Sequence, residues 1–211
     1  MNNNTNFSLT LNKTIEDIEN NYNENKEYLR KFQYIVKEYL INANNRGLLL
    51  YHSPGMGKSI LATSIAEYYR NNDPGRKIII LLSKSLQSNF TSNIKKYIQQ
   101  NDKEKKYSHE IIDKIIENNY KFISLNASNM FVQLQKINYS NKEELFNKQL
   151  KSLNKQIDNF STQTSNKNFL ENSLLIIDEF HNLSNSITNN SSNAVKLYKS
   201  IMNRSEEHTS E

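Results

Sequence analysis

The sequence predicts an α/β fold in which helices cover both sides of a parallel sheet, and three observations support this class. Four short apolar runs suit buried strands, at residues 48–51, 77–82, 120–125 and 173–177. Segments with helical spacing of apolar residues separate these runs. The runs are apolar on both faces, and such strands alternating with helices are typical of a three-layer parallel sheet.

The intervening segments predict helices because their apolar residues recur every three or four positions. In the segment before the first strand, for example, the stripe is Leu29, Phe32, Val36, Tyr39 and Leu40. The helices are expected near residues 24–43, 60–70, 86–97, 110–117, 130–137 and 194–201.

Three stretches lie outside this pattern. Residues 1–23 form a polar N-terminal extension that we expect to fray, and residues 138–170 form an Asn- and Lys-rich insertion with a sparse apolar stripe. Residues 204–211 resemble the translation of a sequencing adapter, so we interpret them as a scar and expect the reading frame to be truncated near Asn203. The predicted domain therefore spans residues 24–203.

Composition excludes several classes of protein. The 211 residues suffice for one substantial domain, with 36% hydrophobic and 23% charged residues and a net charge of +5. The absence of cysteine excludes disulfides, thiolate metal sites and cysteine nucleophiles. No apolar run approaches membrane-spanning length and no secretory signal begins the chain, so we expect an intracellular protein without a membrane partner.

A glycine-containing loop between the first predicted strand and the next helix has the context of a Walker A phosphate-binding loop. Gly55 and Gly57 permit backbone angles that turn several N–H groups toward one point, where the following helix directs its positive end. Lys58 supplies a cation for the β- and γ-phosphates and Ser59 a hydroxyl for Mg²⁺. His52 stands where the general pattern has glycine. The predicted nucleotide-binding residues are Ser53, Pro54, Gly55, Met56, Gly57, Lys58 and Ser59.

The last predicted strand ends in two carboxylates and a histidine. A residue at the carboxyl end of a parallel strand faces the same crevice as a Walker A loop. Asp178 is therefore predicted to hold Mg²⁺, and Glu179 to orient or deprotonate the attacking water. His181 joins this group through its position after Asp-Glu-Phe, although an isolated histidine is more often structural.

The segment Asp178-Glu-Phe-His181 resembles the DExH box of superfamily-2 helicases, and three other segments agree. One of them, residues 51–59, matches the phosphate loop of the group. Leu29-Arg-Lys-Phe-Gln33 resembles their adenine-reading motif, which implies that Gln33 binds the adenine edge. Ile80-Leu-Leu-Ser-Lys-Ser-Leu86 resembles their motif Ia, which implies that Lys84 and Ser85 touch the nucleic-acid backbone. The resemblance covers about residues 29–203.

Within this superfamily, the motifs most resemble those of helicase-like ATPases of large DNA viruses. These ATPases include the small subunit of the early transcription factor and nucleoside triphosphate phosphohydrolase I. This resemblance extends to two further stretches, Asn126-Ala-Ser-Asn129 and residues 178–202. This resemblance implies a RecA-like lobe with ATP and Mg²⁺ as cofactors, DNA rather than RNA as partner, and a transcription complex. It also implies a virion or a cytoplasmic replication site as location. Unwinding and translocation without unwinding both stay open.

The family places an arginine finger on a second lobe, and Arg30, Arg46, Arg70 and Arg76 have no motif that aims them at a γ-phosphate. Because such an arginine accelerates transfer by about a thousandfold or more, we expect these residues alone to bind ATP and hardly to hydrolyse it. Two alternatives remain: another P-loop ATPase such as an AAA-type loader, and a nucleotide-binding assembly subunit without turnover.

Overall fold

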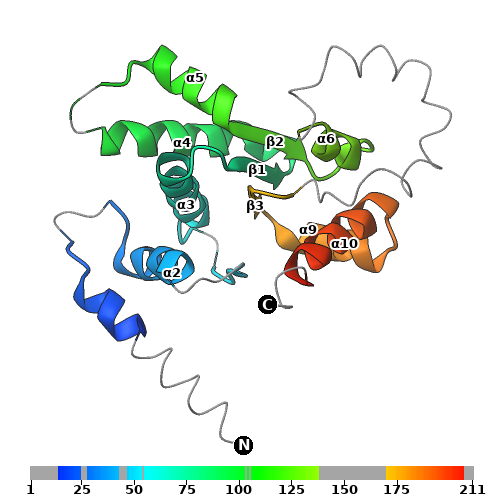
Figure 1. Cartoon of the computed structure of the whole chain (residues 1–211), viewed down its shortest axis with the longest axis horizontal. Coiled ribbons are helices and arrows are strands. Elements are labelled where there is room, and N and C mark those ends of the chain that lie inside the picture. Colours follow the sequence, from blue (N-terminus) through cyan, green and yellow to red (C-terminus); the bar gives the residue numbers. More distant parts are fainter. Residues whose placement is uncertain are drawn as a thin grey trace, which may run out of the picture. The chain divides into compact units, whose positions relative to one another are not determined.

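The computed structural model describes residues 14–24, 28–42, 47–53, 55–102, 104, 106–137 and 170–206, with no side chains for residues 204–206. The chain forms two compact units. Met1–Pro74 and Ser88–Asn119 make up the first, and Gly75–Gln87 and Tyr120–Glu211 make up the second. Figure 1 shows the elements of both units coloured along the chain.

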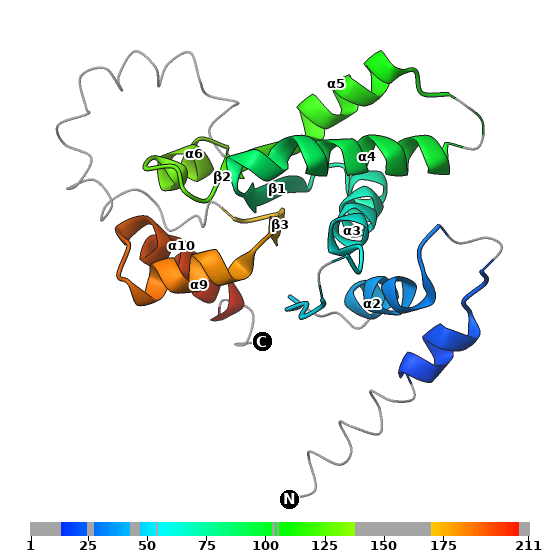
Figure 2. The ribbon, with the colours of Figure 1, turned by 180° about the vertical axis from the view of Figure 1, so that it is seen from behind.

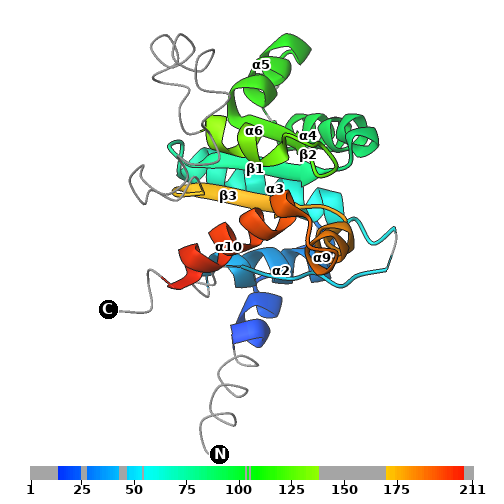
Figure 3. The ribbon, with the colours of Figure 1, turned by 90° about the vertical axis from the view of Figure 1, so that its right-hand side faces the viewer.

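The second unit is built on a parallel sheet of three strands in the order β2-β1-β3. The strands are β1 (Lys77–Leu82), β2 (Tyr120–Ser124) and β3 (Ser173–Ile177). Ile80 of β1 pairs with Phe122 on one side and Ile176 on the other, and Figure 3 shows the strands side by side. The predicted strands at 77–82 and 173–177 are confirmed with their bounds, and the one at 120–125 ends one residue earlier.

Three helices of the second unit cover one face of this sheet: α6 (Met130–Ile137), α9 (Phe180–Thr188) and α10 (Ser192–Glu206). Figures 1 and 2 show them gathered on the same side of the strands. Their buried residues pack with alternate residues of β1, because side chains two apart share a face. The resulting core contains Ile79, Leu81, Ile123, Met130, Leu134, Leu170, Leu183, Ala194 and Leu197. Ile78 and Ile80, which alternate with these residues along β1, are buried as well.

The first unit is helical in its described part. Its helices are α2 (Lys31–Asn42), α3 (Lys58–Asn72), α4 (Gln87–Asn101, whose first residue belongs to the second unit) and α5 (His109–Asn119). Buried residues recur at the predicted spacing, as in Phe90, Ile94 and Ile98 of α4. These predicted helices are therefore confirmed, although α2 is shorter than residues 24–43.

The expectation of a buried strand at residues 48–51 is wrong. The structure assigns no strand there, and the side chains of Leu49 and Tyr51 are 71% and 100% exposed. The run is only four residues long and contains no β-branched residue, whereas Lys77–Leu82 contains three isoleucines. An apolar run alone predicts burial, but forming a strand also requires a partner and residues that suit the pleated backbone.

Two helices were missed. The helix α9 begins directly after Asp178-Glu179, and its signal was present, since Phe180, Leu183 and Ile187 have helical spacing. Residues 14–20 also form a helix with Ile18 buried, so the expectation of a frayed extension is wrong for that segment. The predicted insertion lies outside the described residues except for Leu170, which belongs to the core.

We predict that Leu81→Ala lowers the free energy of unfolding by about 2–5 kcal/mol, because it opens a cavity in the core of the second unit. The matched change Leu49→Ala should cost less than about 0.5 kcal/mol, since that side chain is exposed. Urea unfolding of both variants measures the difference. Equal losses would show that the Leu49 side chain is buried, as the sequence predicted, and would contradict the exposed position of this segment.

Candidate functional site

The loop before α3 contains two left-handed turns. Gly55 has φ 81°, and Gly57 has φ 76° and ψ 34°. Residues other than glycine rarely adopt this left-handed backbone region. Gly57 is the N-cap of α3, and the Leu61 amide donates to its carbonyl at 3.1 Å. The first N–H groups of a helix have no partner within the helix, so the start of α3 can bind an anion. Pro54 lies outside the described residues.

Lys58 is the first residue of α3, and its ammonium lies over the loop. Its Nζ donates to the carbonyls of His52 at 2.9 Å and Ser53 at 3.3 Å. Phosphate oxygens could replace these acceptors, because they are stronger acceptors for a charged donor. Ser59 follows, and its hydroxyl makes no hydrogen bond with any residue that the structure describes. That oxygen is available as a metal ligand.

Gln33 of α2 contacts the same loop near its end. Its side chain is only 4% exposed, and its Nε2 donates to the carbonyls of Met56 and Gly57, both at 3.2 Å. Its neighbour Phe32 packs edge-on against the ring of His52, with ring centroids 5.7 Å apart. The segment that was expected to read adenine therefore supports the phosphate loop in this structure. These contacts could not be inferred from the sequence.

The second unit carries the acidic residues. The amide of Asp178 donates to the Leu81 carbonyl at 2.8 Å, so Asp178 extends β3 at its carboxyl end. Glu179 then turns into the left-handed region, with φ 56°, and caps α9. The Nδ1 of His181 lies 3.2 Å from Oε2 of Glu179, and both side chains are largely exposed. The structure thus pairs two of the residues predicted to be catalytic.

Lys84 and Ser85 follow the neighbouring strand β1 and lie in a single 3₁₀ turn, η1 (Lys84–Leu86). Ser83 and Ser85 share a hydrogen bond of 3.0 Å between their hydroxyls, and Lys84 is exposed. Because β1 and β3 are parallel neighbours, this turn and Asp178 both lie at the carboxyl ends of the strands. Both belong to the second unit, whereas the loop that contains Lys58 belongs to the first.

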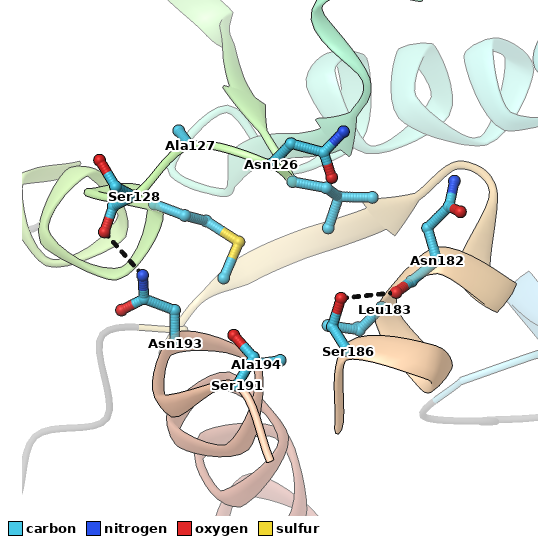
Figure 4. Close-up of a pocket in the computed structure, with 11 residues that line it drawn as sticks. Asn126, Ala127, Ser128, Asn182, Leu183, Ser186, Ser191, Asn193 and Ala194 are labelled. Atoms are coloured by element: carbon cyan, nitrogen blue, oxygen red, sulfur yellow. Dashed lines mark hydrogen bonds between the residues drawn. The ribbon is translucent and has the colours of Figure 1, made fainter. Parts of the chain in front are cut away.

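A pocket of about 270 Å³ lies within the second unit and was not predicted. Its walls are the turn after β2, one side of α9 and the start of α10 (Figure 4). Asn193 Nδ2 donates to the Ser128 carbonyl at 2.7 Å, and Ser186 Oγ donates to the Asn182 carbonyl at 2.8 Å. None of its lining residues is charged, so its chemistry differs from that of the phosphate loop. The nearest signal in the sequence is the stretch of residues 126–129.

Two properties of the described residues bear on the class of site. No group of three or more His, Asp or Glu side chains there could hold a metal by itself. A magnesium ion that is shared with phosphate oxygens and water needs only one or two protein ligands. None of the described helices is both long and apolar enough to cross a bilayer.

Comparison with known proteins identifies related sequences. Residues 10–209 match the family described as the type III restriction enzyme res subunit. The chain is 28% identical to a termination factor NPH-I homologue of African swine fever virus from a Malawi tick, over 95% of this chain and 27% of that protein. It is 33% identical to the homologue of a South African tick isolate, over 75% and 18%.

A candidate ATP-dependent RNA helicase of Acanthamoeba polyphaga mimivirus is 31% identical over 65% of this chain and 21% of its own length. No solved structure matches the chain significantly. The chain therefore spans about a quarter or less of the length of these relatives.

The left-handed backbone at Glu179 predicts that this residue lowers the stability of the fold. A residue with a Cβ is strained there, so Glu179→Gly should stabilise the protein by about 1 kcal/mol in urea unfolding. Asn190→Gly is the matched control, because Asn190 also has positive φ and asparagine tolerates that region. The control should gain much less. Destabilisation by Glu179→Gly would show that Glu179 is kept for structure.

Proposed function

Because the chain belongs to the family of the type III restriction enzyme res subunit, a family of helicase-type ATPases with a RecA-like P-loop fold, we propose that it is the ATP-binding lobe of a nucleic-acid motor. The motor would be of the superfamily-2 type and would serve viral transcription. The African swine fever virus relatives are named as homologues of the termination factor NPH-I, which supports the second part. The family match also favours this function over that of an AAA-type loader.

The observation that carries the proposal is the start of α3. Gly57 in the left-handed region places the first N–H groups of α3, the Lys58 ammonium and the Ser59 hydroxyl at one end of a 15-residue helix. The helix dipole and these donors suit a triphosphate. Residues 53–59 would bind the phosphates, with Lys58 giving up the carbonyls of His52 and Ser53.

The residues also fit a magnesium ion. Ser59 and Asp178 would hold Mg²⁺, which compensates negative charge on the phosphates during transfer. Glu179 would orient the attacking water and accept its proton, since a carboxylate within hydrogen-bond reach can act as a general base. His181 lies 3.2 Å from Glu179 and would hold that carboxylate in position. This arrangement requires the loop and the acidic residues to act on one nucleotide.

Efficient turnover would also need a cation beside the γ-phosphate. Arg70 cannot supply it, because it lies near the far end of α3 and its guanidinium is bonded to Glu67 at 2.9 and 2.7 Å. At about 1.5 Å per helical residue, the twelve positions from Lys58 to Arg70 span about 18 Å. We therefore propose that these residues bind ATP and hydrolyse it slowly, and that an arginine elsewhere in the protein completes the site.

DNA is the proposed partner, and the exposed Lys84 and Ser85 are the proposed phosphate contacts. The mimivirus relative is named for RNA, so the experiment below includes both nucleic acids. We propose an intracellular location, which for a viral protein would be the virion or a cytoplasmic replication site, and a transcription complex as a further partner. The alternative of an assembly subunit without turnover is less favoured because Lys58, Asp178 and Glu179 are all present.

The nucleotide site predicts that Lys58→Ala weakens Mg²⁺-ATP binding by about 1.5–3 kcal/mol, because it removes a charge-assisted contact. Isothermal titration calorimetry measures the loss. Lys114→Ala is the control, since Lys114 is an exposed lysine on α5 of the same unit. Equal affinities of the wild type and Lys58→Ala would contradict the proposed site.

The nucleic-acid contact predicts that Lys84→Ala weakens binding to DNA without changing sequence preference. Removing one phosphate contact should also lower the slope of log affinity against log salt concentration by about 1. Fluorescence anisotropy with DNA and RNA oligonucleotides over a range of salt measures both. The exposed Lys199 of α10 provides the control change, Lys199→Ala. An unchanged slope for Lys84→Ala would refute the contact.

A further inference from the structure

The Gln33 side chain connects the start of one helix to the start of another. Its Oε1 accepts a hydrogen bond from the Arg30 amide at 3.0 Å, which caps α2. An N3 glutamine that reaches back to the N-cap N–H is half of a capping box. Its Nε2 donates to the carbonyls of Met56 and Gly57 at 3.2 Å, directly before α3. One buried amide therefore bridges α2 and the phosphate loop.

Only an amide can make this bridge. The NH₂ group has two N–H donors, and two loop carbonyls accept from it, while the oxygen accepts from the backbone of α2. A glutamate of the same size could still accept from Arg30 but could not donate to the loop when ionised. An alanine could do neither. These contacts explain why position 33 is a glutamine, and the explanation does not require a bound nucleotide.

The loop is shaped to receive this amide. A Cβ added at Gly57 would lie 2.5 Å from Nε2 of Gln33, which is far inside van der Waals contact. Glycine suits this position because of its positive φ, and without a Cβ it also lets the Gln33 amide approach this closely. At the other end of the loop, Phe32 packs against His52. Two adjacent residues of α2 hold the loop at both ends.

We infer that Gln33 is a positioning residue for the phosphate loop, so that triphosphate binding depends on it even when no base is present. The inference rests on the proposed nucleotide site and gives Gln33 a role that competes with the adenine-reading role that the sequence implied for it. Both N–H groups of Gln33 are directed at the loop and its side chain is buried. To donate to adenine, the amide would have to release the loop.

The test separates the loop from the base by using Mg²⁺-tripolyphosphate, ATP and GTP as probes of the whole chain. Gln33→Glu keeps the cap of α2 and removes the two donors to the loop. Calorimetry should show affinities for all three probes falling together, by about tenfold, as expected for losing two neutral hydrogen bonds. Gln100→Glu adds the same charge at an exposed glutamine of α4 in the same unit and should change none of them.

A second measurement needs no variant. In the wild type, the side-chain amide resonances of Gln33 should shift in NMR spectra when Mg²⁺-tripolyphosphate is added, because the loop they contact closes on the phosphates. Adenosine alone should leave them unchanged. A weaker ATP affinity of Gln33→Glu with unchanged tripolyphosphate affinity, or a shift caused by adenosine only, would overturn the inference. A wild type that bound none of the three probes would overturn the proposed function, and the inference with it.

Discussion

The left-handed turn at Gly57 is the constraint on which the candidate site depends. It ends the loop and begins α3, so Lys58 and the first N–H groups of that helix face the same space. A residue with a side chain would be strained at this φ, and its Cβ would lie 2.5 Å from Nε2 of Gln33, so the buried amide would have to move. Local backbone geometry and the packing of α2 thus both favour the turn at Gly57, and the anion-binding chemistry of the start of α3 follows from this turn.

Much of the fold could be predicted because its signals are local. Ser173–Ile177 and Lys77–Leu82 are apolar runs rich in isoleucine, and the structure gives both strands the predicted bounds. Residues 48–51 are equally apolar, but they form no strand, because pairing depends on a partner that the run does not specify. The helix α9 is harder to predict because its first residues also belong to the acidic motif, although Leu183 and Ile187 have helical spacing.

The site was predicted as a set of residues but not as a set of contacts. Glycine spacing and a following lysine identify a phosphate loop, since the chemistry requires those residue types in that order. Nothing in the order of residues shows that Gln33 donates to the loop or that Glu179 adopts a positive φ beside His181. Those features arise from packing between segments that are distant in sequence.

The most direct test of the central claim is a crystal structure of this chain with Mg²⁺ and a non-hydrolysable ATP analogue. The account predicts that the β- and γ-phosphates lie against the loop of residues 55–59, with the Lys58 ammonium transferred to them from the carbonyls of His52 and Ser53. It also predicts that Ser59 and Asp178 approach the same metal ion. A nucleotide bound elsewhere, or a Lys58 that kept its bonds to both carbonyls beside a bound triphosphate, would contradict the account.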